Sequence, residues 1–179
     1  MPSLRLATGA TLGFLAGLAL PHARKAVMQG PSVMAGDWVD ALKAEHRIVQ
    51  AAFAKLLETN DDQAMQREFL LSKIAYALTK HGIEEENVIY PALSETSHAQ
   101  EARKLFEEHS DIKTFIYDLR RLPAGDPAWL ARARQFSDHV DAHIREEEDE
   151  IFPAFRDALP DAENERLTRM LNWEGFKVA

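Results

Sequence analysis

Hydrophobic residues recur every three to four positions along nearly the whole chain from residue 37 onward. This period places apolar side chains on one face of an α-helix, and no run shows the alternation of a half-buried strand. The pattern predicts four long helices, at 37–59, 62–93, 97–122 and 126–159, and a short fifth helix at 162–173. We therefore expect an all-α protein.

The breaks between the predicted helices are short and rich in turn-forming residues. They include Asn60-Asp61-Asp62, the stretch 94–97 and the stretch 123–127, which has two prolines and a glycine. Helices joined by such short connections are antiparallel neighbours. The expected architecture is an up-down-up-down four-helix bundle at 37–160, followed by a tail at 161–179 that forms a short C-terminal helix.

The first 36 residues have a different composition, apolar and rich in small side chains. Gly9, Gly13 and Gly17 would share one face of a helix and let another helix approach closely. The apolar run at 6–21 is shorter than the ~20 residues that span a bilayer. We expect an extra N-terminal helical segment at 1–36 that contacts a second copy or a partner chain, with membrane association as the alternative.

Composition narrows the classes of function. A formal net charge of −8 over 179 residues argues against nucleic-acid binding, which needs a basic face for the phosphates. The chain has no cysteine, which excludes thiolate metal sites, iron–sulfur clusters and thiol nucleophiles. Any metal must be bound through nitrogen and oxygen. The absence of cysteine fits the reducing cytoplasm, where we expect the protein.

Each predicted bundle helix carries one histidine in line with its apolar face. These histidines are His46, His81, His109 and His143, and Glu85 and Glu147 follow the second and fourth of them by one turn. Buried polar groups without partners would cost roughly 2–7 kcal/mol each. Bound metal ions remove this cost because the imidazoles and carboxylates become ligands. We therefore predict a metal site rather than a structural cluster of histidines.

An internal repeat makes the expected geometry more specific. The stretches HGIEEENVIYPAL at 81–93 and HIREEEDEIFPAF at 143–155 match at His, all three Glu, Ile, Pro and Ala, with an offset of 62 residues. Two hairpins of nearly equal length would place their ligands at one level of the bundle. We expect two metals, each bound by two imidazoles and bridged by Glu85, Glu147 and a solvent oxygen. Each metal would keep a position open for a small molecule.

Several neighbouring residues have the wrong helical phase for this centre. Surface charge is expected of Glu84, Glu86, Glu146 and Glu148. His139 lies at the edge of the inner face, where it is a hydrogen-bond partner of a ligand, an added ligand or a half-buried rim residue, and it stays outside the ligand set. Tyr90 has no phase that predicts a role. Pro91 and Pro153 should loosen or kink their helices just past the site.

The motifs together resemble the hemerythrin-like, or HHE cation-binding, domain family over residues 37–159. The residues that carry the resemblance are Glu45-His46, His81-x-x-x-Glu85 before Ile-Tyr-Pro, Glu108-His109, and His143-x-x-x-Glu147 before Ile-Phe-Pro. The resemblance implies two non-haem iron ions with an oxo or hydroxo bridge. It also implies that the four histidines are terminal ligands and that Glu85 and Glu147 bridge. Manganese and zinc are alternatives, because such donors bind them too.

One departure from the family affects the expected function. Oxygen-carrying members place a second histidine one turn along the third helix, where this chain has Lys113. The resemblance therefore implies binding or sensing of oxygen or of reactive oxygen or nitrogen species, with a diatomic molecule or a peroxide as ligand, rather than simple oxygen storage. The alternatives are a di-iron enzyme acting on peroxide or nitric oxide, with catalytic residues unidentified, and an iron sensing or sequestration protein. A ferritin-like site is disfavoured, because the chain has one suitable Glu-x-x-His motif, Glu95 to His98, and such a site needs two.

Overall fold

The computed structural model describes Met34 and residues 36–179. The predicted N-terminal segment, with its glycine stripe, lies almost entirely outside the described residues, so its contact with another chain or a membrane stays a prediction. Within the described part, the chain forms helices joined by short connections, and it contains no strand. This confirms the predicted all-α class.

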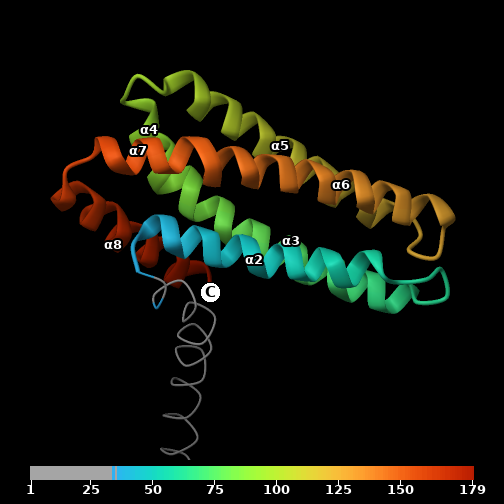
Figure 1. Cartoon of the computed structure of the whole chain (residues 1–179). Coiled ribbons are helices and arrows are strands. Elements are labelled where there is room, and N and C mark those ends of the chain that lie inside the picture. Colours follow the sequence, from blue (N-terminus) through green and yellow to red (C-terminus); the bar gives the residue numbers. More distant parts are fainter. Residues whose placement is uncertain (1–33, 35) are drawn as a thin grey trace, which may run out of the picture.

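Four long helices pack side by side in alternating directions (Figure 1). They are α2 (Trp38–Leu57), α3 (Ala64–Glu84), α5 (Ala99–Arg121) and α6 (Pro127–Glu146). Two short helices continue α3 and α6 after an irregular turn, namely α4 (Tyr90–Ser94) and α7 (Phe152–Ala158). The arrangement is the predicted up-down-up-down bundle.

Side chains fix where two of the long helices begin. Asp37 caps α2 by accepting a hydrogen bond from the backbone N–H of Asp40 at 3.1 Å. Asp126 caps α6 by accepting from the N–H of Ala128 at 2.8 Å. Pro127 follows it in the first turn, where its missing N–H costs nothing. Asp126 lies in one of the predicted connections, and Asp37 is the residue at which the first bundle helix was predicted to begin.

The irregular turns are two short π-helical segments, η1 (Glu85–Ile89) and η2 (Glu147–Ile151). After each one, a backbone N–H bonds the carbonyl five residues earlier, as from Tyr90 to Glu85. A proline follows one residue later in both cases, and in a regular helix its ring would clash with the carbonyl four residues before it. The widened turn relieves this clash. The distortion predicted just past the site therefore lies at the two candidate bridging carboxylates themselves.

The apolar core consists of two clusters with the polar candidate residues between them. One cluster fills the end of the bundle that contains Val49, Leu78 and Ile112. The other fills the opposite end and contains Leu42 and Val88. Along α2 and α5, the histidine separates residues of one cluster from residues of the other, and after α3 and α6 the second cluster begins in the irregular turn that follows. Each candidate ligand is positioned by packing on both sides.

The C-terminal helix α8 (Asp161–Val178) is longer than predicted and lies along α2, α3 and η1 (Figure 1). Trp38 holds it through two hydrogen bonds, from Nε1 to Asn164 Oδ1 at 2.9 Å and from the backbone N–H to Thr168 Oγ1 at 3.1 Å. At the other end, the Tyr76 hydroxyl donates to the Val178 carbonyl at 3.3 Å. The helix therefore supports the segment from which Glu85 projects.

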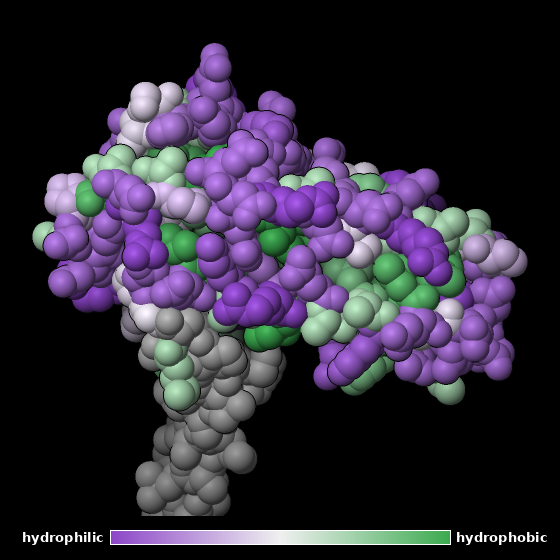
Figure 2. All heavy atoms as spheres, viewed as in Figure 1, coloured by the Kyte–Doolittle hydropathy of each residue, from purple (hydrophilic) through white to green (hydrophobic). Residues whose placement is uncertain are grey.

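Hydrophilic side chains cover most of the described face shown in Figure 2. Across the described residues, no helix is both long enough and apolar enough to cross a membrane.

We expect Asn164→Ala to lower the free energy of unfolding by about 1–3 kcal/mol, because the fully buried indole N–H of Trp38 would lose its acceptor. Urea denaturation measures this change. The control is Glu165→Ala on the exposed face of α8, which should change stability by less than about 0.5 kcal/mol. Equal effects of the two substitutions would contradict the anchoring role of the Trp38–Asn164 bond.

Candidate metal centre

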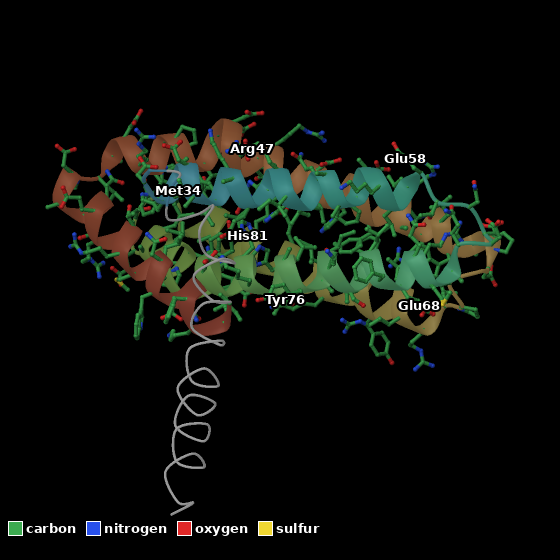
Figure 3. All side chains as sticks on the ribbon, turned by 90° about the horizontal axis from the view of Figure 1, so that it is seen from below. Met34, Arg47, Glu58, Glu68, Tyr76 and His81 are labelled. Carbon is green, nitrogen blue, oxygen red and sulfur yellow. The ribbon has the colours of Figure 1, made fainter. Side chains whose placement is uncertain are left out.

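The structure brings all six predicted ligands together in one buried layer. They are His46 on α2, His81 on α3, Glu85 at the start of η1, His109 on α5, His143 on α6 and Glu147 at the start of η2. None is more than 4% exposed. Figure 3 shows His81 between the helices, whereas Arg47 and Glu68 lie on outer faces.

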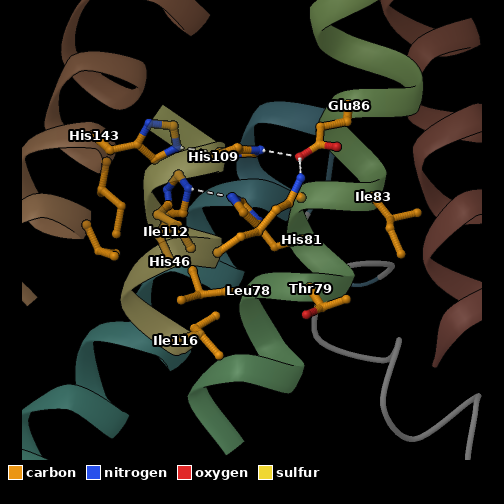
Figure 4. A pocket seen from close by; sticks show the side chains of 14 residues that line it. His46, Leu78, Thr79, His81, Ile83, Glu86, His109, Ile112, Ile116 and His143 are labelled. Atoms are coloured by element: carbon orange, nitrogen blue, oxygen red, sulfur yellow. Dashed lines mark hydrogen bonds and ion pairs between the residues drawn. The ribbon is translucent and has the colours of Figure 1, made fainter. Parts of the chain in front are cut away.

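The four imidazoles form two pairs whose Nε2 atoms face one another (Figure 4). These atoms are 2.9 Å apart in the pair His46–His81 and 3.2 Å apart in the pair His109–His143. Glu85 Oε2 lies 3.0 Å from Nε2 of His81 and 3.2 Å from Nε2 of His109. Glu147 Oε2 lies 3.3 Å from Nε2 of His46 and 3.4 Å from Nε2 of His143. Each carboxylate thus joins one histidine of one pair to one of the other.

The donor set fits a pair of metal ions. Ligand atoms of His46, His81, Glu85 and Glu147 lie within 4.8 Å of one another, and so do those of Glu85, His109 and His143. Glu85 Oε1 and Glu147 Oε2 are buried and make no hydrogen bond, a state that is costly for a carboxylate oxygen. Nitrogen and oxygen donors of this kind suit iron, manganese and zinc.

Four further carboxylates form a ring around the imidazoles, and each one faces the outer nitrogen of one imidazole. The Nδ1-to-oxygen distances are 2.8 Å for His46–Glu148, 3.3 Å for His81–Glu45, 3.0 Å for His109–Glu86 and 2.8 Å for His143–Glu108. A carboxylate there holds the proton on Nδ1, which leaves the Nε2 lone pair directed inward. Each contact links one bundle helix to another, so the four together close a ring around the bundle.

The prediction that Glu86 and Glu148 are surface charges is therefore wrong, as is the same prediction for Glu84. Glu86 and Glu148 lie within the π-helical turns, to which the regular helical period does not apply, and their long side chains reach back to histidines on other helices. Glu84 is fully buried beside Lys80, whose Nζ lies 2.7 Å from it and 2.5 Å from Glu45. Glu146, by contrast, is half-buried and pairs with the exposed Lys104.

The electrostatics of the layer favour positive charge inside it. Burial opposes ionisation of Glu85, but attraction to His81 and hydrogen bonds from His109 and His81 outweigh burial and hold the pKa of this carboxyl well below its usual range. Burial likewise opposes protonation of His109, yet its contacts with Glu85 and Glu86 raise its pKa to about 9. Without metal, the carboxylates thus favour protonated imidazoles. A bound cation would take over that role.

Tyr90 is a central residue that the sequence pattern missed. Its buried hydroxyl donates to Glu147 Oε1 at 2.6 Å and lies 3.2 Å from Glu85 Oε2 and 3.0 Å from His109 Nε2. Burial and the charges of both carboxylates raise its pKa well above the usual value. The hydroxyl is a further oxygen donor within reach of a metal. Its repeat equivalent is Phe152, and this difference between the copies is the signal that could have identified it.

His139 lies outside both groups of candidate ligands. It is half-buried, its Nε2 is 3.4 Å from the backbone oxygen of Glu108, and its ring packs against Phe115 with centroids 5.4 Å apart. Of the alternatives for this residue, the structure shows the half-buried rim position.

The bundle and its layer of four imidazoles and two carboxylates define a metal-binding helical protein. A family model, the hemerythrin HHE cation binding domain, matches residues 37–155. The chain therefore belongs to the hemerythrin HHE cation-binding domain family, as its motifs predicted.

Two individual proteins are similar to parts of the chain. A DNA nickase from Nostoc sp. is 30% identical over 141 residues, which are 79% of this chain and 40% of that protein. The chain thus spans about two fifths of the length of that curated relative. A hemerythrin HHE cation binding domain-containing protein from Mycobacterium kansasii has a solved structure that aligns with a TM-score of 0.70 at 24% identity. The alignment covers 79% of this chain and 86% of that one, and it supports the fold.

We expect Glu148→Ala to weaken metal binding by roughly 10–100-fold, because His46 would lose the partner of its Nδ1 and with it a fixed ring orientation. Competition against a coloured chelator measures this affinity. The matched control is Asp149→Ala, at the exposed next residue, which should bind metal as the unmodified protein does. Unchanged affinity in Glu148→Ala would show that the carboxylate ring does not support the centre.

Proposed function

We propose that this chain binds two non-haem iron ions and, through them, binds or senses oxygen or reactive oxygen or nitrogen species in the cytoplasm. The observation that carries the proposal is that Glu85 and Glu147 each join the two histidine pairs. This arrangement suits two ions held side by side. We choose iron rather than manganese or zinc because the family resemblance implies iron. When bound, an iron pair supplies redox capacity and open coordination positions for a small ligand.

A cavity of about 90 Å³ beside the imidazoles supports a small ligand (Figure 4). Its apolar walls are formed by Leu78, Ile112, Ile116, Val140 and Ile144. Pockets for larger organic ligands are typically about 300–1,000 Å³. The cavity is therefore of a size for oxygen, nitric oxide or a peroxide.

The residues around the centre have separate tasks in this proposal. The outer carboxylates hold the Nδ1 protons and orient the rings. The apolar walls offer water few hydrogen-bond partners within the cavity. The Tyr90 hydroxyl, in contact with both Glu85 and Glu147, holds a proton within the layer.

We do not assign to this chain the DNA-nicking activity that the name of the Nostoc relative indicates. The match leaves more than half of that protein without a counterpart in this chain. A net charge of −8 also gives this chain little attraction for a phosphate backbone.

Iron loading followed by metal analysis should give about two irons per chain, one for each histidine pair. Glu85→Ala should lower this ratio, because Glu85 contacts both pairs. Glu150→Ala, at an exposed position of η2, is the control and should retain the full ratio. Less than one iron per chain in the unmodified protein would refute the di-iron assignment. Many irons per chain would favour sequestration.

A sensor should react with nitric oxide or peroxide in proportion to its iron content and then stop. We expect such stoichiometric binding, seen in the visible spectrum, together with a change in shape measured by small-angle scattering. Steady consumption of peroxide or nitric oxide over many equivalents would instead identify the protein as a di-iron enzyme.

A further inference from the structure

The cavity beside the imidazoles reaches solvent on one side. Four of its lining residues are exposed or half-exposed, namely Thr79, Ile83, Glu86 and Lys113, and the others are buried. The first three belong to α3 and η1, and Lys113 belongs to α5. The opening therefore lies between α3 and α5, where Figure 4 shows Glu86 beside His109.

The internal repeat provides a closed counterpart of this opening. When His81 is aligned with His143 and His46 with His109, the repeat equivalents of Thr79 and Lys113 are Asp141 on α6 and Gln50 on α2. There, Gln50 Nε2 donates to Asp141 Oδ1 at 3.0 Å and links the two helices. The repeat equivalent of Gly82 is Ile144, whose side chain is 4% exposed and fills the wall. The same position thus carries a bulky side chain in one half and none in the other.

Gly82 leaves room at the entrance. A Cβ atom added there would lie 3.4 Å from His109 Nδ1 and 3.6 Å from Glu86 Oε1, in ordinary van der Waals contact. Alanine would therefore fit, whereas the further carbons of a branched side chain would crowd His109 and Glu86 at the entrance.

An ion pair crosses the rim of the opening. Lys113 Nζ lies 2.7 Å from Glu86 Oε1, which also accepts from His109 Nδ1 at 3.0 Å. The Lys113 side chain is 66% exposed, so it can swing away at little cost. Glu86 therefore contributes both to the orientation of His109 and to the rim of the cavity.

We propose that small ligands reach the metal centre through this entrance between α3 and α5, and that Gly82 sets the size of ligand that passes. The proposal rests on the proposed function in one respect, that the cavity receives the ligand. The opposite face, between α2 and α6, is closed by Ile144 and the Gln50–Asp141 bond.

The first test uses azide as the probe and the iron-loaded protein. Gly82→Ile copies the closed half and should slow azide association, followed by stopped-flow absorbance, by roughly tenfold or more. Gly82→Ala and Gln50→Ala should associate at nearly the rate of the unmodified protein. Ile83→Trp narrows the rim without touching the imidazoles and serves as a second blocking variant if Gly82→Ile folds poorly. An unchanged rate in a blocking variant with full iron content, or equal slowing by Gln50→Ala, would overturn the proposal.

The second test needs no metal. Xenon enters dry apolar cavities, and its rate of exchange can be followed by saturation-transfer NMR on the metal-free protein. Exchange should slow in Gly82→Ile and Ile83→Trp but not in Gln50→Ala. Exchange that is the same in all variants would overturn the entrance even if iron binds. Slowed exchange in a protein that binds no iron would support the entrance and refute the proposed function alone.

Discussion

The burial of two carboxylates in the middle of the bundle is the constraint on which the rest of this structure depends. Glu85 and Glu147 have no exposed surface, and a buried carboxylate costs several kcal/mol unless it is paired. Four imidazoles surround the two carboxylates, and four outer carboxylates surround the imidazoles. An apolar cluster packs at each end of this layer. Because each group is the partner of another, the layer is stable as a unit, and a cation at its centre completes it.

The repeat explains how two helical hairpins build this layer, and its departures from symmetry carry the specific chemistry. Tyr90 places a hydroxyl between the carboxylates where the other copy has Phe152. Gly82 leaves an opening where the other copy has Ile144. A symmetric pair of hairpins would bind two ions in equivalent surroundings. The observed pair has a proton donor at its centre and an opening on one side, so the surroundings of the two histidine pairs differ.

The helices and the six candidate ligands could be predicted from the sequence because both follow the regular helical period. The period fails at η1 and η2, where the π-helical turns rotate every later residue, and this is why Tyr90, Glu86 and Glu148 were not expected at the centre. The length of α8 was underestimated for another reason. A glycine often indicates a helix end, but Gly175 lies inside α8 and is buried there.

We propose that the two histidine pairs hold one metal ion each, joined by Glu85 and Glu147. Anomalous diffraction at the iron absorption edge, from crystals of the iron-loaded protein, tests it most directly. We expect two peaks within the buried layer, one beside Nε2 of His46 and His81 and the other beside Nε2 of His109 and His143. A single peak, or iron bound outside this layer, would contradict it.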